Sequence, residues 1–266
     1  MKRQLQLGNL ATRFFSYVQM RKKRTVQTGE IAPILGLSSS QEKDLLRRLG
    51  RSGWILRLRR GLYLIPPRLP AGGQYSPGVY VILDELMKDA NGTYQICGPS
   101  AFSFYGFDNQ IPAVTYAYNN RISGNRRIGG LSFQLIKVAD DRLGDTTTSK
   151  AGDGAVAVYS SRARTLVDVI YDWSKFNGIP RGYGWISNDL SGNRTAVTEI
   201  VQCAVRYGNQ ATIRRIGFFL DRAKNTPTVL RRLRRELSKA RSLIPLDPTK
   251  PARGSINRTW GIIVND

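Results

Sequence analysis

One short stretch of the sequence carries side chains suited to contact with a polyanion. Between residues 38 and 51, polar and cationic residues recur every three or four positions, a spacing that places them on one face of a helix. The members of this set are Ser40, Lys43, Arg47 and Arg51. Their hydroxyl, ammonium and guanidinium groups can donate hydrogen bonds to base edges and phosphates. A solvated basic face that only keeps the protein soluble is the alternative interpretation.

The residues around this set predict the elements that hold it. A short helix is predicted over 29–35, and Gly36 ends it with a turn. Ser38 and Gln41 then have the spacing of a capping box, which predicts a second helix over 39–51. Two helices joined by such a tight turn form a helix-turn-helix, in which the second helix lies in the major groove of DNA.

The second predicted helix has an apolar face opposite its polar one. Leu45, Leu46 and Leu49 share that face and are expected to pack on the first helix. Two short apolar runs follow, at 54–58 and 62–65, and predict a β-hairpin. The hairpin has three arginines suited to phosphates or a minor groove, Arg57, Arg59 and Arg60. Helix, turn, helix and basic hairpin is the order of a winged helix-turn-helix.

The segment before the helix-turn-helix extends this prediction. Apolar residues at helical spacing predict a first helix over 10–19, and Val26 is expected to add a third strand to the wing. Between them lies a basic run that contains Lys22, Lys23 and Arg24. Such a run is usually only solvated, and phosphate contact is the second interpretation.

The charge of the whole chain favours a polyanionic partner. The 266 residues have a formal net charge of +22 and a pI near 10.6. Residues 1–73 carry 15 Lys and Arg against three Asp and Glu, so the charge is concentrated there. Anionic membrane is the competing partner, yet no apolar run reaches the roughly 18 residues of a spanning helix. The N-terminus also lacks the apolar core of a signal peptide. We therefore expect a cytoplasmic protein that binds double-stranded DNA and no membrane.

Several kinds of catalytic and metal site find no support in the sequence. There is no histidine, which removes Ser-His-Asp and Cys-His pairs and histidine ligands. Cys97 and Cys203 lack the spacing of a zinc site or a disulfide framework. The acid pairs at 84–85 and 140–141 have no third acid and lysine at a nuclease-like spacing. We expect no enzyme activity, metal or cofactor; a magnesium-dependent nucleic-acid-processing enzyme and a non-specific nucleic-acid-binding protein are the alternatives.

Prolines and glycines between residues 66 and 73 predict a linker and two domains, 1–70 and 75–266. The fold class is α+β: a winged helix-turn-helix plus a larger mixed α/β domain that ends in helices. In that domain, strands are predicted at 94–97, 114–118, 131–138 and 155–159, and helices at 76–89, 99–105, 162–173, 195–207, 211–223 and 228–241. No heptad run is present, so we expect a monomer in solution.

The last of these helices has an apolar stripe and a basic flank. The cations off the stripe include Arg231, Arg234, Arg235 and Lys239. A surface helix packed by its leucines and a second polyanion-binding surface are equally compatible with the pattern.

Several motifs, in order along nearly the whole chain, resemble those of AbiEi-type antitoxins, the regulators of type IV toxin–antitoxin pairs in phage defence. They lie at 60–66 (RGLYLIP), 100–106 (SAFSFYG), 161–168 (SRARTLVD), 216–220 (IGFFL), 246–248 (LDP) and 260–265 (WGIIVN). Departures are a Gly- and Arg-rich insert at 124–130 and Tyr105, where the family commonly has histidine.

The resemblance implies a division of labour. The N-terminal domain would bind inverted repeats in the promoter of its own operon and repress it. The C-terminal domain would counter a toxin similar to a nucleotidyltransferase, and in type IV systems the antitoxin need not bind that toxin.

Overall fold

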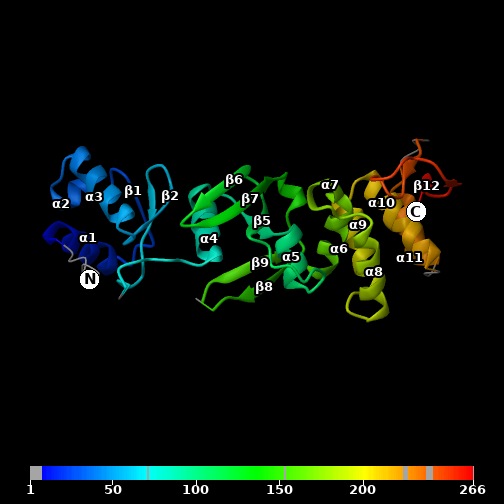
Figure 1. The fold of residues 1–266 in the computed structure, drawn as a ribbon, viewed down its shortest axis with the longest axis horizontal. Coiled ribbons are helices and arrows are strands. Elements are labelled where there is room, and N and C mark those ends of the chain that lie inside the picture. Colours follow the sequence, from blue (N-terminus) through cyan, green and yellow to red (C-terminus); the bar gives the residue numbers. More distant parts are fainter. Residues whose placement is uncertain (1–7, 71, 153, 224–226, 238–241, 266) are drawn as a thin grey trace. The chain divides into compact units, whose positions relative to one another are not determined.

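The computed structural model describes residues 8–70, 72–152, 154–223, 227–237 and 242–265 (Figure 1). The chain forms two compact units. The first comprises Met1–Thr93, Ser123–Leu135 and Lys150–Val156, and the second comprises Tyr94–Ile122, Ile136–Ser149 and Ala157–Asp266. The fold is α+β, with a winged helix-turn-helix followed by a larger α/β region, as predicted. The predicted division into 1–70 and 75–266 concerns independent folding, and it stays a prediction.

The first unit begins with the winged helix-turn-helix. Its elements are α1 (Asn9–Met20), β1 (Thr25–Gln27), α2 (Ala32–Leu35), α3 (Ser39–Arg51), β2 (Leu56–Arg59) and β3 (Leu62–Leu64). The strands form an antiparallel sheet in the order β1-β3-β2, in which Val26 is paired with Tyr63. The expected third strand of the wing is therefore present.

Local sequence explains where α3 begins and what it packs on. The Ser38 hydroxyl accepts the Gln41 N–H at 3.2 Å, and the Gln41 side chain accepts the Ser38 N–H at 2.8 Å, which completes the predicted capping box. Leu45, Leu46 and Leu49 are buried in one cluster with the apolar face of α1. The polar face of α3 is thereby left in solvent.

The first helix of the motif is shorter than predicted. Helix α2 begins at Ala32 rather than at residue 29, and Gly36 ends it in the left-handed conformation, at φ 67°. The reason is that the buried Glu42 carboxylate accepts the N–H groups of Gly29 and Ile31, which holds the chain before Ala32 in a turn.

Two further elements of the first unit differ from the sequence-based expectation. Helix α4 (Val79–Asp89) begins after Gly78, so Pro77 precedes the helix instead of lying in its first turn. Residues that the sequence presented as a Gly- and Arg-rich insert form a strand, β6 (Gly124–Ile128), which pairs antiparallel with β7 (Leu131–Lys137). Gly129 and Gly130, at φ 58° and 84°, make the two-residue turn between them.

The second unit contains most of the remaining elements. They are β4 (Tyr94–Ile96), α5 (Gly98–Phe104), β5 (Val114–Asn119), the 3-10 helix Asp140–Arg142, β8 (Thr146–Lys150), β9 (Val156–Ser160), α6 (Arg162–Tyr171), α7 (Trp173–Phe176), α8 (Arg181–Ser191), α9 (Val197–Tyr207), α10 (Gln210–Arg222), α11 (Pro227–Arg235), β10 (Ile244–Pro245), β11 (Ser255–Asn257) and β12 (Ile262–Val264). The strand order of the large sheet is β6-β7-β5-β4-β9-β8, and that of the small C-terminal sheet is β10-β12-β11. The large sheet is mixed, since β4 is antiparallel to β5 and parallel to β9.

Helix α6 is the centre of the second unit. Nearly every side chain in it is buried, and it packs on α5, α8, α9 and α10. Leu166 and Ile170 lie in an apolar cluster that also holds Trp260 from the C-terminal segment. Helix α11 ends at Arg235, short of the predicted end at residue 241, and residues 238–241 lie outside the described part of the chain. Across the described residues, no helix combines the length and apolar composition needed to span a bilayer.

Candidate nucleic-acid interface

The outward face of α3 gathers the residues predicted to contact DNA. Ser40, Lys43, Arg47 and Arg51 are all exposed, because the helix is anchored by its leucines on the opposite side. Beside them lies Arg48, which the sequence analysis did not single out, and a hollow of about 370 Å³ is lined by Asp44, Arg47, Arg48, Arg51 and Ser52. The structure therefore places the predicted cations on a single solvent-facing surface.

The cations of α3 differ in how they are neutralised. Arg47 is paired with Asp44 at 2.6 Å, and both side chains are more than half exposed. An exposed pair of this kind contributes only about 0–1 kcal/mol, so Arg47 can leave it for a phosphate at little cost. Within the described part of the chain, no carboxylate lies at salt-bridge distance from Lys43 or Arg51. These two side chains are available to an anionic partner without any rearrangement.

The wing arginines fall into two groups. Arg57 and Arg60 are exposed and have no acidic partner among the residues described. Arg59 instead makes a two-pronged contact with Asp89 of α4, in which the Nε–Oδ2 and Nη2–Oδ1 distances are both 2.6 Å. That hydrogen bonding raises the pKa of Arg59 above its ordinary value. The sequence could not indicate this pairing, since the two residues are 30 positions apart.

The cations of the basic run between α1 and β1 also differ in whether an acid pairs with them. Lys23 forms an ion pair with Glu30, and hydrogen bonding to that carboxylate raises the pKa of Lys23. Arg24 lies 3.8 Å from Glu85 but keeps an exposed side chain. Lys22 is exposed in a turn, at φ 51°, and no described acid pairs with it. Lys22 is thus the member of the run best placed for a phosphate.

Glu42 is the residue of this module that sequence reasoning missed. Its side chain is fully buried, and its Oε1 atom accepts the N–H groups of Ile31 at 2.7 Å and Ala32 at 3.2 Å. Its Oε2 atom accepts the N–H of Gly29 at 2.6 Å. One carboxylate on α3 thereby satisfies N–H groups that the start of α2 leaves without helical partners. An acid on the apolar side of α3, three residues before Leu45, was the available signal.

The second predicted basic surface, on α11, is only partly available. Arg231 and Arg235 are exposed. Arg234 lies 3.2 Å from Asp221 and 5.4 Å from the centroid of the Trp260 ring, so it braces the C-terminal segment. Lys239 lies outside the described residues. Arg232, an exposed neighbour that the prediction omitted, completes a basic face with Arg231 and Arg235.

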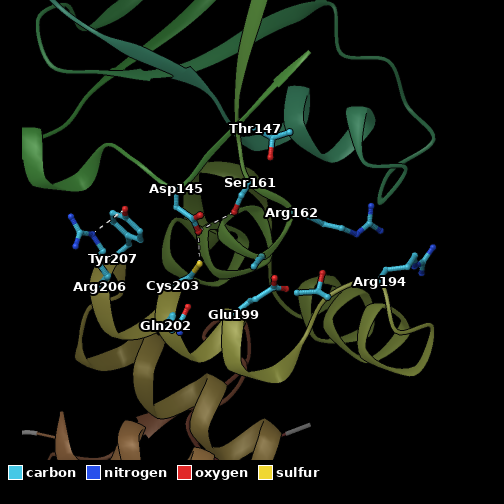
Figure 2. Close-up of a pocket in the computed structure, with 12 residues that line it drawn as sticks. Asp145, Thr147, Ser161, Arg162, Arg194, Glu199, Gln202, Cys203, Arg206 and Tyr207 are labelled. Atoms are coloured by element: carbon cyan, nitrogen blue, oxygen red, sulfur yellow. Dashed lines mark hydrogen bonds between the residues drawn. The ribbon is translucent and has the colours of Figure 1, made fainter. Parts of the chain in front are cut away.

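The second unit also contains a pocket of about 600 Å³ (Figure 2). Near its middle, Asp145 accepts hydrogen bonds from Ser161 at 3.0 Å and from the Cys203 thiol at 2.7 Å. Burial, reinforced by Asp145, raises the pKa of Cys203, so the thiol is held protonated and is a poor nucleophile. Figure 2 shows the Arg162 and Arg194 head groups directed away from Asp145, and both pair with the buried Asp189, at 2.6 and 3.2 Å, so an acid already neutralises these two cations.

The residues of the 161–168 motif have a structural role. Arg164 is fully buried, and its Nε atom lies 2.9 Å from both carboxylate oxygens of Asp168. Arg142 adds a third contact to Asp168 at 3.1 Å. Burial raises the pKa of Asp168 although both arginines oppose it. The two guanidinium groups also stack on tyrosines, Arg164 on Tyr207 and Arg142 on Tyr171. The motif therefore ties α6 to the rest of the unit.

No metal-binding arrangement is found among the described residues, where no three or more Cys, Asp or Glu side chains are grouped to hold an ion. The acid pairs at 84–85 and 140–141 lie in helix α4 and the short 3-10 helix. Within α4, Glu85 forms an ion pair with Lys88 at 2.9 Å.

Comparison with known families places the N-terminal module. Residues 16–66, from within α1 to the end of the wing, match the family described as "Transcriptional regulator, AbiEi antitoxin". This segment is AbiEi-like. The match agrees with the resemblance inferred from the sequence, and of the motifs that carried it the matched segment contains the one at 60–66. The AbiEi family is one of regulators, and its description names no catalytic activity.

Comparison with solved structures concerns the whole chain. The fold is similar to that of the RV2827C protein from Mycobacterium tuberculosis, with a TM-score of 0.58 and 14% sequence identity. The similarity covers 97% of this chain and 92% of that one, so the two share one architecture along nearly their full length. No curated protein matches the chain.

Proposed function

We propose that the protein is an antitoxin and DNA-binding autorepressor of a type IV toxin–antitoxin operon. The observation that carries the proposal is the solvent-facing surface of α3 inside the AbiEi-like segment, where no acid of the described residues pairs with Lys43 or Arg51. Arg164, which ties helix α6 to the rest of the second unit, is instead buried and paired with Asp168. A group of unpaired cations on the second helix of a helix-turn-helix suits the major groove of DNA.

The proposed binding mode assigns different tasks to the helix and the wing. Ser40, Lys43 and Arg47 would meet base edges, and each good two-pronged contact of this kind is worth about 1–3 kcal/mol. Arg57 and Arg60 of the wing would meet phosphates or the minor groove and would contribute affinity without sequence preference. The operator would be the inverted repeats in the promoter of the protein's own operon.

A mobility-shift experiment with the DNA upstream of the operon tests this mode. Arg47→Ala should weaken binding to that DNA more than to a scrambled duplex, and Arg51→Ala should weaken binding to that DNA as well. Arg57→Ala should weaken both duplexes alike and make binding less sensitive to salt. Arg253→Ala, which removes an exposed arginine from the second unit, is the matched control. Wild-type affinity in the Arg47→Ala and Arg51→Ala variants would refute the proposal.

The same experiment separates the alternatives. Equal wild-type affinity for the operon DNA and for random DNA would indicate a non-specific nucleic-acid-binding protein. Magnesium-dependent turnover of DNA, RNA or nucleotides, abolished by an Asp→Ala substitution, would indicate an enzyme.

For the antitoxin role, we propose that residues 75–266 carry protection against a nucleotidyltransferase-like toxin. A 75–266 fragment should lose operator binding and retain at least part of the protection when it is co-expressed with the neighbouring toxin gene. Arg231→Glu with Arg235→Glu should then weaken protection without unfolding the fragment, since both side chains lie off the buried Leu230 and Leu233. Full toxicity with a soluble, folded fragment would move protection to the winged module.

We further propose that the protein acts in the cytoplasm and is a monomer in solution that occupies two half-sites on its operator. Light scattering of the DNA-free protein should give the mass of one chain. A stable dimer without DNA would contradict the monomer.

A further inference from the structure

We propose that the β6–β7 hairpin is a second DNA-contacting element beside the wing, one that binds backbone phosphates outside the bases met by α3. The inference rests on the proposed DNA binding and adds an interaction surface to it. Its centre is the pair Arg126 and Arg127 on β6.

The β6–β7 hairpin lies against the wing. Its turn packs on strand β2 of the wing: a Cβ atom built on Gly129 would lie 2.8 Å from Leu56 Cδ1. Both residues belong to the first compact unit. A Cβ atom at this position would require the Leu56 side chain to shift, and the positive φ of Gly129 also favours glycine. The hairpin is thus seated against the strand that carries Arg57 and Arg59.

One face of the hairpin is polar. Arg126 is opposite the buried Phe133, while Arg127 is opposite Ser132, so the two arginines lie on different faces. Asn125 is paired with Gln134 on the same face as Arg127. That face therefore presents a guanidinium, two amides and a hydroxyl, which are all groups that donate hydrogen bonds to phosphate oxygens.

The charges of the two hairpin arginines are not neutralised by the described part of the chain. Arg126 and Arg127 are exposed, and for neither does the described chain supply a carboxylate at salt-bridge distance. The Arg126 side chain donates a hydrogen bond to the carbonyl oxygen of Asn125 at 3.3 Å, a contact that leaves its charge unneutralised. In the same unit, Arg24 and Arg59 have acidic partners in α4, Glu85 and Asp89. The hairpin arginines keep their full charge for an external anion.

Charged residues on an edge strand can also serve only to prevent edge-to-edge association, and β6 is the edge of its sheet. The two roles predict different salt dependences. Phosphate contacts release counterions, so losing the Arg127 contact should reduce the slope of log K against log salt by about 0.9, and losing an Arg126 contact made around the edge of β6 brings the reduction to about 1.8. A purely protective role leaves that slope unchanged.

The test compares wild type with the Arg126→Ala/Arg127→Ala double variant by fluorescence anisotropy. The probes are a duplex limited to the operator repeats and the same duplex with about one helical turn added at each end. At about 0.1 M salt the double variant should bind the longer duplex roughly 10-fold or more weakly, with the smaller salt slope. Its preference for operator over scrambled DNA should be unchanged. Arg126→Lys/Arg127→Lys, which keeps the charge, should retain most of the affinity.

The outcomes separate this inference from the proposed function. If wild type binds the operator and Arg51→Ala weakens it, while the hairpin double variant keeps wild-type affinity and slope, only the hairpin inference fails. If wild type shows no binding or no operator preference, the proposed function fails first. Light scattering of the double variant completes the test, because aggregation together with an unchanged salt slope would assign the arginines to edge protection.

Discussion

The buried Glu42 carboxylate allows a sharp test of how the helix-turn-helix is held together. Glu42→Gln keeps the shape of the side chain but replaces one carboxylate oxygen with an NH₂ group, which cannot accept a hydrogen bond. Wild-type Oε1 accepts from Ile31 and Ala32, and Oε2 accepts from Gly29. In the best rotamer the amide oxygen keeps the first two bonds, and the NH₂ group faces the N–H of Gly29.

The magnitude follows from these contacts. A hydrogen bond to a charged group contributes about 1.5–3 kcal/mol and a neutral one about 0.5–1.5, so the two retained bonds together lose about 2 kcal/mol. The N–H of Gly29 loses its partner but is only part-buried, so water replaces part of that bond. A negative charge in the first turn of α3 is lost as well, at about 0.3–1 kcal/mol. The expected destabilisation of this module is about 2–4 kcal/mol.

Hydrogen exchange in the full chain measures this effect locally. Amides in the segment 29–37 should exchange roughly 30- to 1000-fold faster in Glu42→Gln, because each factor of ten corresponds to about 1.4 kcal/mol. Asp44→Asn, which removes an exposed acid two residues away, should change exchange less than about fivefold. Operator affinity should also fall in Glu42→Gln, because α3 loses its anchor to α2. Exchange of 29–37 within threefold of wild type would refute the reasoning.

Two further predictions concern the second unit. Gly217→Ala should destabilise the chain by about 2 kcal/mol or more, because the new Cβ would lie 2.1 Å from the Trp260 ring. Gly184→Ala should stabilise it by up to about 1 kcal/mol, because a Cβ there would have no atom within 4 Å and alanine favours a helix. Thermal unfolding of the two variants measures both effects. Asp189 is buried, which raises its pKa, but hydrogen bonds from Arg162 and others outweigh burial and the pKa lies below its ordinary value. The stabilisation of the fold by the ionised Asp189 side chain is therefore fully present above the unfolded-state pKa near 4, and it is lost as the pH falls through the lower pKa of the folded state. Asp189→Asn should lower the free energy of unfolding, measured with urea at pH 7, by about 3 kcal/mol. The difference in unfolding free energy between wild type and Asp189→Asn should become smaller below about pH 4. A difference that does not change with pH would contradict this assignment.

Sequence patterns predicted the elements whose signals are local. The capping pair Ser38 and Gln41, the turn at Gly36 and the leucine stripe of α3 act within a few residues of one another. Because the hydrogen bonds of a helix are local, such signals suffice to place it. The same applies to the wing, where strands β2 and β3 are joined by a short turn.

Elements that depend on distant partners were missed. Helix α8 contains Gly182 and Gly184, and glycine lowers the helical propensity of a segment. The helix forms nonetheless, because Gly182 allows a close backbone approach to Val169 of α6 and because Ile186 is buried. Strand β6 has the composition of a loop and becomes a strand through its pairing with β7. In both cases packing outweighs intrinsic propensity.

The candidate interface divides along the same line. The sequence by itself determined which residue types lie on the outward face of α3 and on the wing, because helical periodicity decides that and is a local property. Only the tertiary structure decided which of those cations are neutralised. Asp89 pairs with Arg59 across 30 residues, and Glu85 lies near Arg24, while Lys43 and Arg51 have no described acidic partner. Charge pairing depends on distances in space, which spacing along a chain does not reveal.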